Sequence, residues 1–346
     1  MGDAIATGLG TFSKSKFNAL LNVRAAALGA LRTALVQEDC TEVSTSSLVN
    51  IAGSCENPYA SFTLNYYGRE AHLSQSAQLQ LEALVIRLKR GVFTVNNSFR
   101  EENYDDPEMQ GRRLSEFTLI EQERPYEGTN AASALDAIVK LEEVIIKNAT
   151  KVVLEKNEND VKHLGGDIPY LMKVVHNPFS RITYDEALAL LNKKSGKYSF
   201  GDDLGIKEER LILLHFNNNP VFVTHYPARI KFFNMKRTED GERVYSADLL
   251  MPRLGETTGG AVREENGQNI TRYLMASSIA RYIQERGGDT LQTFAEYLNL
   301  FRDEEPILRG GFGIGFERYI GFLLGSNDIL ETIAYRSMQP KSGAKM

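Results

Sequence analysis

Glycines 311, 313 and 315 alternate along a short segment near the C-terminus, and Arg318 follows them closely. Alternate glycines leave one face of an extended segment without side chains, so a flat ligand can lie directly on the backbone. The apolar residues after Gly315 predict a helix with Arg318 in its first turn, where a fixed guanidinium suits a phosphate or a purine face. The segment lacks the Lys-Ser/Thr of a P-loop and the third glycine of a dinucleotide fingerprint. It therefore indicates a nucleotide site of a less usual kind, with tight helix–strand packing as the alternative.

A second group of candidate residues lies on a predicted hairpin. Arg100 and Glu102 follow its first strand, Arg113 stands on the return of the loop, and Phe117 lies at the start of the second strand. An arginine at a strand end can neutralise a carboxylate and a phosphate together, and two further arginines on the loop, Arg112 and Arg113, can reach a polyphosphate tail. Phe117 can stack on a base. The alternative interpretation is a solvated, charged hairpin.

A third group combines two acids, an arginine and a glutamine. Asp248 and Glu256, if they converge, can hold Mg²⁺ against phosphate oxygens, because this hard cation prefers oxygen ligands. Arg263 follows a predicted turn at 259–260 and can hold a carboxylate or an amide oxygen. Gln78, at a predicted helix start, can accept a hydrogen bond from an ammonium group. Taken singly, these residues fit a surface hairpin and an ordinary helix N-terminus equally well.

Hydrophobic periodicity predicts the elements that hold these residues. Helices are expected over 16–36, 78–89, 131–156, 182–194, 270–286 and 290–301, and strands over 61–67, 92–99, 116–123 and within 220–262, with turns at 240–241 and 259–260. Because the strands do not alternate regularly with helices, we expect an α+β fold with an antiparallel β-sheet flanked by helices. We expect residues 1–15 to form a flexible lead-in and residues 16–346 to form a single domain.

Composition narrows the class of protein. A net charge of −5 over 346 residues gives no general attraction to nucleic acid or anionic membranes, so any polyanion contact must be local. Two cysteines, Cys40 and Cys55, are too few for a disulfide framework. The N-terminus has no basic start followed by an apolar block, and no apolar run approaches the roughly 18 residues of a membrane span. These features predict a cytoplasmic protein without a membrane partner.

Taken together, the motifs resemble the class II aminoacyl-tRNA synthetases. The segment 99–102 resembles motif 2 and the segment 311–318 resembles motif 3; segments 201–205, 220–227 and 255–264 resemble the aspartyl/asparaginyl branch. Residues 78–82 are closer to the asparaginyl side, because Leu81 stands where aspartyl enzymes have a lysine that grips the substrate carboxylate. The resemblance runs from about Phe17 to about Tyr335 and implies a class II synthetase-type catalytic domain.

The resemblance also implies a reaction. The carboxylate of an Asn- or Asp-like amino acid attacks ATP and gives an acyl adenylate and pyrophosphate, with positioning and charge neutralisation carrying the rate. Arg100, Glu102 and Arg318 are implied as the catalytic residues. Arg100 would bind the α-phosphate and the amino-acid carboxylate, and Glu102 would bind the adenine or the amino group. Arg113 would stand near the γ-phosphate, and Phe117 and Arg318 would enclose adenine.

The remaining contacts are implied in the same way. The ATP site would also include Glu256, Gly313 and Gly315, and Mg²⁺ would be held by Asp248 and Glu256. The residues implied for the amino acid are Gln78 for its ammonium group, Arg100 for its carboxylate and Arg263 for its side chain. A homodimer is expected, as is usual in the family.

The sequence departs from the family pattern in four places. There is no room before about Phe17 for the anticodon-binding barrel, and the motif 1 segment 42–47 has no proline, which leaves the dimer geometry open. The motif 2 loop carries Asp105, Asp106 and Glu108, which oppose phosphate binding. His225 stands where the asparaginyl enzymes commonly have an aspartate.

These departures lead to an expectation about the acceptor of the acyl group. We expect an AMP-forming ligase that passes an Asn- or Asp-like acyl group to ammonia, an amine or another small acceptor. One alternative is a true asparaginyl-tRNA synthetase that charges the tRNA acceptor end without its own anticodon domain. The other is a non-catalytic paralog that senses an amino acid or a nucleotide.

Overall fold

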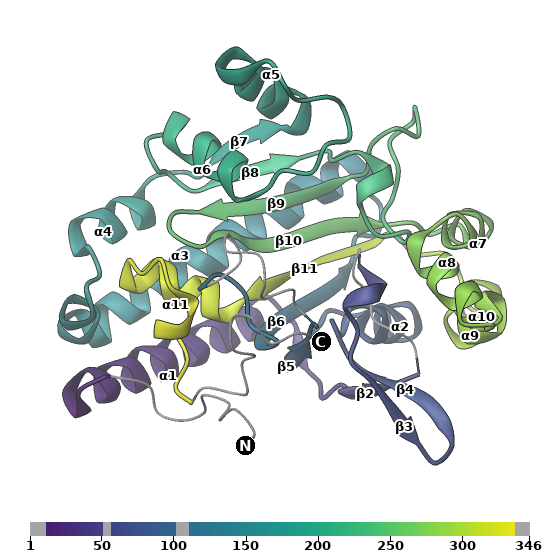
Figure 1. Cartoon of the computed structure of the whole chain (residues 1–346), viewed down its shortest axis with the longest axis horizontal. Helices are drawn as coiled ribbons and strands as arrows, with labels where there is room; N and C mark the ends of the chain where they lie inside the picture. Colours follow the sequence, from purple (N-terminus) through teal and green to yellow (C-terminus); the bar gives the residue numbers. More distant parts are fainter. Residues whose placement is uncertain (1–11, 51–56, 102–110, 336–346) are drawn as a thin grey trace, which may run out of the picture.

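An eight-stranded sheet forms the centre of the protein (Figure 1). The structure is a computed structural model that describes residues 12–50, 57–101 and 111–335. In spatial order the strands are β1 (Thr41–Glu42), β5 (Val92–Phe99), β6 (Glu116–Pro125), β11 (Arg309–Gly315), β10 (Gly255–Arg263), β9 (Ser246–Met251), β8 (Val221–Thr224) and β7 (Ser180–Thr183). The pairs β1–β5 and β7–β8 are parallel, and the other neighbouring strands are antiparallel. This arrangement confirms the predicted α+β fold.

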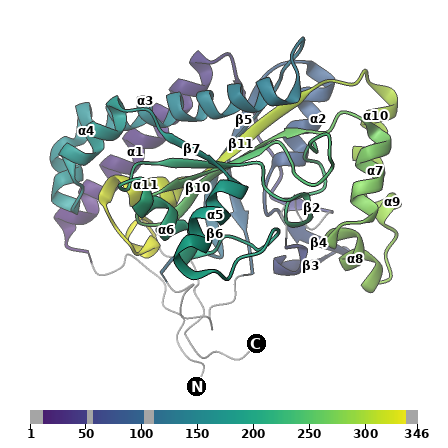
Figure 2. The ribbon, with the colours of Figure 1, turned by 90° about the horizontal axis from the view of Figure 1, so that it is seen from above.

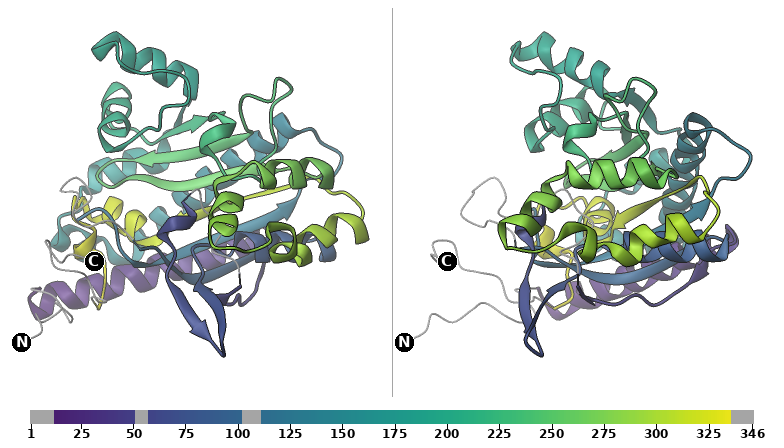
Figure 3. Two further views of the ribbon diagram at one scale, coloured as in Figure 1. Left: turned by 45° about the vertical axis from the view of Figure 1, so that its right-hand side comes forward. Right: turned by 90° about the vertical axis from the view of Figure 1, so that its right-hand side faces the viewer.

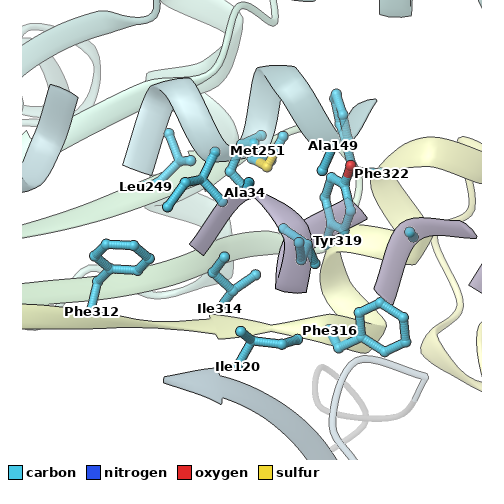
Figure 4. Close-up of a cluster of buried hydrophobic side chains, with 14 of the residues drawn as sticks. Ala34, Ile120, Ala149, Leu249, Met251, Phe312, Ile314, Phe316, Tyr319 and Phe322 are labelled. Atoms are coloured by element: carbon cyan, nitrogen blue, oxygen red, sulfur yellow. The ribbon is translucent and has the colours of Figure 1, made fainter. Parts of the chain in front are cut away.

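Four helices cover one face of the sheet (Figure 2). They are α1 (Lys14–Gln37), α3 (Ala131–Leu164), α4 (Ile168–His176) and α11 (Phe316–Leu324). Side chains alternate between the two faces of a strand, so Phe312 and Ile314 of β11 enter the core between the sheet and these helices, as Figure 4 shows. The odd-numbered glycines of β11 therefore face the opposite side.

The long helix α1 qualifies a prediction from the sequence. The sequence was expected to contain no apolar run long enough to span a membrane, but α1 is long and apolar enough by length and composition. In the structure α1 packs along α3, and its Leu20, Val23, Leu31 and Leu35 are buried in the main core. The feature is therefore that of a core helix.

The other elements frame the opposite face and the ends of the sheet (Figures 1 and 3). They are η1 (Pro58–Ala60), α2 (Gln78–Leu88), α5 (Tyr184–Ser195), α6 (Ile206–His215), η2 (Ala228–Ile230), α7 (Gly267–Met275), α8 (Ser278–Glu285), α9 (Thr290–Thr293), α10 (Ala295–Asp303) and η3 (Ile329–Glu331). A small second sheet has the order β2 (Leu48–Val49), β4 (Arg69–Leu73), β3 (Thr63–Tyr66). Helix α2 packs against β5 and β6. Its N-terminus therefore lies beside β6, the strand that pairs with the glycine-containing strand β11.

The predicted turn at Gly259–Gly260 is wrong. Both glycines lie inside β10, where they pair with β9 and β11. A Cβ on Gly260 would lie 2.6 Å from Glu142 Oε1 and 3.2 Å from the carbonyl oxygen of Gly311. Gly260 is therefore required by close packing of the sheet against α3 and not by a turn.

Other boundaries also differ from the expected ones. Ile182 belongs to β7, and α5 begins after Thr183, which forms the predicted capping box with Glu186. The helix expected over 270–286 is divided, because Ser277 caps the start of α8. Helices α4 and α6 were not predicted. Short helices with few periodic positions give little signal above that of a loop.

Candidate active site

A cavity of about 500 Å³ lies over the face of the sheet that carries the odd-numbered glycines. Arg100, Arg263 and Arg318, which are far apart in the sequence, all line it. The other predicted site residues that line it are Gln78, Arg113, Phe117, Asp248, Glu256, Gly313 and Gly315. Glu102 lies outside the described residues. The described residues of the predicted site are thus brought together, while their roles remain predictions.

The glycines of β11 have two different functions in the architecture. A Cβ on Gly313 or Gly315 would lie 3.4 Å from its nearest neighbour, which is ordinary contact, so these two positions are bare because they face the cavity. A Cβ on Gly311 would lie 1.9 Å from the carbonyl oxygen of Gln122. Gly311 is therefore required for strand pairing, and Gly313 and Gly315 form the floor of the cavity.

Arg318 lies at the end of the cavity assigned to the nucleotide. Its Nη1 donates to the main-chain oxygen of Glu256 and lies 3.9 Å from the Oε2 of that residue. The side chain is 29% exposed and lines the cavity. Arg100 lies over the Phe117 ring, with its Cζ 5.1 Å from the centroid. The residues assigned to adenine and to phosphate therefore form one cationic and aromatic surface.

Glu209 and Arg112 also line this end; Arg112 was expected near a polyphosphate tail, whereas sequence reasoning missed Glu209. Glu209 comes from α6 and accepts the main-chain N–H of Glu256 at 3.2 Å. Burial and the neighbouring Glu256 charge raise the pKa of Glu209 to about 7, while Arg318 and Arg112 oppose the shift. Gly255, at φ +81°, makes this approach possible, because a Cβ there would lie 1.9 Å from Glu209 Oε2.

The two predicted metal ligands converge on one point. Asp248 Oδ1 and Glu256 Oε1 each lie 3.5 Å from the position of a Cβ on Gly259. Asp248 Oδ2 also accepts from Lys231 Nζ at 2.7 Å, so an ammonium group already neutralises one of the acids. Among the described residues there is no group of three or more His, Cys, Asp or Glu side chains that could hold a metal ion. A metal here would need phosphate oxygens or water to complete its coordination.

A buried ion pair lies at the opposite end of the cavity. Arg263 Nε donates to Glu123 Oε1 at 3.2 Å, and the two side chains are 4% and 1% exposed. Burial raises the pKa of Glu123, and the Arg263 guanidinium opposes that shift. Glu123 was not predicted as a site residue, because 140 positions separate it from Arg263 and only the pairing of β6, β11 and β10 brings them together.

A second buried carboxylate holds Gln78 in place. Glu82 Oε1 accepts from Gln78 Nε2 at 3.2 Å and also from Asn234 Nδ2. Its Oε2 accepts from Arg309 Nε and from the Tyr297 hydroxyl, each at 3.0 Å. Because the Gln78 amide nitrogen is held by Glu82, its amide oxygen is the atom available to a ligand. This orientation suits the predicted role of Gln78 as an acceptor for an ammonium group.

The start of α2 is fixed from the sheet. Glu121 of β6 accepts the main-chain N–H of Ala77 at 2.8 Å and also accepts from the Ser76 hydroxyl. Burial raises the pKa of Glu121, and these hydrogen bonds oppose the shift. The contact holds the first turn of α2, and with it Gln78, against the strand that also carries Phe117 and Glu123.

Comparison with known proteins agrees with this geometry. Residues 8–339 match the family described as tRNA synthetases class II (D, K and N). The asparagine–tRNA ligase of Pyrococcus abyssi is 33% identical over 333 residues, which cover 96% of this chain and 70% of that protein. The enzyme of Desulforamulus reducens is 33% identical over 323 residues, which cover 93% of this chain and 69% of the relative.

Solved structures give the same result. Asparaginyl-tRNA synthetase from Pyrococcus horikoshii, complexed with asparaginyl-adenylate, is 32% identical with a TM-score of 0.80, covering 92% of this chain and 68% of that chain. The Entamoeba histolytica enzyme, at 23% identity and a TM-score of 0.76, supports the fold alone. The chain therefore belongs to the class II tRNA synthetases of the D, K and N group, close to the asparaginyl enzymes, and is a ligase of the type that forms an aminoacyl adenylate.

Proposed function

We propose that the protein activates asparagine with ATP, forms asparaginyl adenylate and pyrophosphate, and transfers the asparaginyl group to tRNA in the cytoplasm. The observation that carries the choice of amino acid is the buried pair of Arg263 and Glu123 in the cavity. A carboxamide has an N–H donor for a carboxylate and an oxygen acceptor for a guanidinium. An aspartate side chain would bring a second carboxylate beside Glu123, and like charges at short range are costly when buried. The pair therefore favours a neutral amide.

The other cavity residues supply positions for the amino-acid backbone. Gln78 would offer its amide oxygen to the ammonium group, and Arg100, which lines the same cavity, would neutralise the carboxylate that attacks ATP. Holding these groups fixes the attacking oxygen, and no side chain has to remove a proton in this step. This agrees with a cavity rich in arginine.

The nucleotide occupies the other end in this proposal. Adenine lies between Phe117 and Arg318 on the floor of Gly313 and Gly315, and Arg113 meets the distal phosphates. Arg100 and Arg318 neutralise charge that develops on the α-phosphate as pyrophosphate leaves. Glu102 completes the set of catalytic residues carried over from the family, at a position outside the described residues.

Magnesium fits the two converging acids. Asp248 and Glu256 would hold the ion, which would neutralise phosphate charge when bound. Lys231 holds Asp248 in its present orientation at 2.7 Å, so the acid stays in the cavity. The metal is supported by the chemistry of these side chains and by the need of ATP for a divalent cation.

The choice of tRNA as acceptor differs from the expectation drawn from the sequence. A small acceptor such as ammonia or an amine is not supported by the comparisons, because the relatives are named asparagine–tRNA ligases and cover most of this chain. The comparisons give better support to the alternative expectation, in which the acyl group is transferred to tRNA. We also propose a homodimer, the assembly that the family resemblance implies.

The acceptor can be tested with one preparation of the protein. It is incubated with ATP and labelled asparagine, and either total tRNA or ammonium and simple amines are added. Asparagine-dependent pyrophosphate exchange together with label that precipitates with tRNA in acid and is released by mild alkali would support the proposal. Exchange with label in a small amide, and none on tRNA, would establish the small-acceptor ligase instead. Binding of asparagine or ATP without exchange would indicate a sensor.

A further inference from the structure

Glu317 lies between the two residues proposed to enclose adenine. It is the chain neighbour of Arg318 in the first turn of α11, and its Oε2 accepts the main-chain N–H of Thr118 at 2.9 Å. Thr118 is in turn the neighbour of Phe117 on β6. The Glu317 carboxylate therefore links β6, which carries Phe117, to α11, which carries Arg318. Glu317 is 4% exposed, so little water can replace this contact.

Arg24 holds this carboxylate from a different part of the fold. It lies on α1, and its Nη2 donates to Glu317 Oε1 at 3.1 Å. The guanidinium also lies over the Phe316 ring, with its Cζ 4.8 Å from the centroid, and its Nη1 donates to the main-chain oxygen of Thr332. Thr332 follows η3, whose Ile329 lines the cavity. Arg24 thus contacts α11 and the end of η3 at once.

We propose that Arg24 is a positioning residue for the nucleotide, acting through Glu317 to set the separation of Phe117 and Arg318. The geometry gives the reason. A buried carboxylate without its cation either takes up a proton or turns toward water. Either change weakens the contact with the Thr118 N–H, so the strand and the helix are no longer joined at the adenine site.

The inference rests on the proposed ATP site and not on the acceptor, and asparagine binding enters only as a check on the rest of the cavity. The readout is therefore the dissociation constant of ATP, measured by calorimetry without amino acid or tRNA. Binding of ATP to the wild-type protein can be measured even if no amino acid is activated. Failure of the proposed function and failure of this inference are thus separate results.

The chain supplies a matched control on the same helix. Arg32 of α1 also pairs with one glutamate, with Nε 3.0 Å from Glu42 Oε1, but both side chains are about two-fifths exposed. Arg32→Ala removes an arginine and an ion pair from α1 without touching the cavity. We expect Arg24→Ala to weaken ATP binding about tenfold to hundredfold, the usual value of a lost charged hydrogen bond, and Arg32→Ala to leave it within twofold.

Two further variants separate positioning from simple support. Glu317→Gln keeps the shape but loses the charge, so we expect it to weaken ATP binding in the same direction as Arg24→Ala. Arg24→Lys, which can keep one of the two hydrogen bonds, should fall between wild type and Arg24→Ala. If Arg24→Ala does not fold, the lysine and glutamine variants provide the test. Asparagine binding should stay within about twofold of wild type in all of them.

The proposal is overturned by either of two results. In the first, the Arg24 and Glu317 variants lower the melting temperature but leave the ATP dissociation constant within twofold of wild type, which would show a purely structural contact. In the second, ATP and asparagine affinities fall together, which would show a general loosening of the cavity.

Discussion

The two ends of the cavity handle charge in opposite ways. At the amino-acid end, Arg263 pairs with Glu123, and Arg309 pairs with Glu82, with every side chain at most 4% exposed. At the nucleotide end, Arg318 and Glu256 are 29% and 45% exposed and lie 3.9 Å apart. One end is closed, with its charges paired in the interior, whereas the other is open and presents partly exposed charged groups.

The difference matches what each end has to bind. Burying an ion pair costs desolvation that its attraction seldom exceeds, so such pairs are better explained by specificity than by stability. A pocket that reads a small neutral side chain benefits from fixed, dry donors and acceptors. A triphosphate brings its own charge and must release pyrophosphate, so an open cationic surface serves it better.

The largest expected effect comes from removing a buried ion pair at the amino-acid end of the cavity. Arg309→Met leaves Glu82 buried without its cation, and we expect a loss of about 3–5 kcal/mol in the free energy of unfolding, measured by urea denaturation. The control is Arg286→Ala, which breaks the surface pair with Glu70, where both side chains are nearly half exposed. That change should cost about 0–1 kcal/mol. Equal losses in the two variants would remove the distinction between the two kinds of pair.

A change in the charge of Glu123 tests how the closed end reads its substrate. Glu123→Gln keeps the volume but gives Arg263 a neutral partner, and we expect asparagine kcat/KM to fall by a factor that corresponds to about 1.5–3 kcal/mol. The KM for ATP should stay within about threefold, because the pair lies away from the nucleotide end. The measurement is pyrophosphate exchange with either substrate varied. An unchanged asparagine kcat/KM would exclude Glu123 from the amino-acid pocket.

Arg318→Ala is the equivalent change at the open end. It removes a stacking face and a phosphate contact, each worth about 1–3 kcal/mol, so adenylate formation should be severely reduced. Stability should change little, because the side chain is partly exposed and its acid partner is 3.9 Å away. Pyrophosphate exchange at near-normal rates would show that Arg318 has no part in adenylate formation.

Two glycines of β11, Gly311 and Gly313, distinguish a position needed for folding from one needed for ATP binding. A Cβ on Gly311 would lie 1.9 Å from a backbone oxygen, so Gly311→Ala should lower the free energy of unfolding by about 1–3 kcal/mol. A Cβ on Gly313 would be 3.4 Å from its nearest neighbour, so Gly313→Ala should fold normally and raise the KM for ATP by covering the floor. Thermal unfolding and exchange kinetics on both variants are sufficient. A stable Gly311→Ala protein would contradict the assignment.

The smallest effect concerns Glu142, whose carboxyl is fully buried. Glu142 of α3 accepts from the Thr258 hydroxyl, and burial together with the Asp248 charge raises its pKa to about 8. Between the ordinary value near 4.5 and about 8 the folded state keeps the proton that the unfolded state has lost. Rising pH in this window therefore lowers stability, and the slope ends above about 8.

Glu142→Gln removes that titration while keeping the hydrogen bond from Thr258. We expect the difference in unfolding free energy between the variant and wild type to shift by about 1–2 kcal/mol in favour of the variant from pH 6.5 to pH 7.5. Urea denaturation at the two pH values gives the result. A pH-independent difference would show that Glu142 is already ionised in the folded protein.

The sequence predicts the open end of the cavity better than the closed end. Gly313, Gly315 and Arg318 lie close together in the chain, so their spacing alone indicated a site. Glu123 and Glu82 gave no such signal, because their partners are 140 and 227 positions away and their burial depends on strand order. Glu209 was missed for a related reason, because it lies on a short helix that periodicity did not predict.

Secondary-structure elements were likewise predicted well only where the local sequence pattern determines them. Helix α1 and the hairpin β5–β6 were predicted within a few residues, because each has a long and regular apolar pattern. The pair Gly259–Gly260 was interpreted as a turn, because its local composition is that of a turn. Its real cause is the approach of Glu142 and β11, which no local pattern shows.

The central claim is that one cavity holds ATP and reads a carboxamide through Glu123 and Arg263. Pyrophosphate exchange by the wild-type protein, with asparagine and aspartate as competing substrates, tests it most directly. We expect kcat/KM for asparagine to exceed that for aspartate by at least about a hundredfold, because the acid would face a buried carboxylate. Exchange that is equal for the two amino acids, or faster with aspartate, would contradict the account.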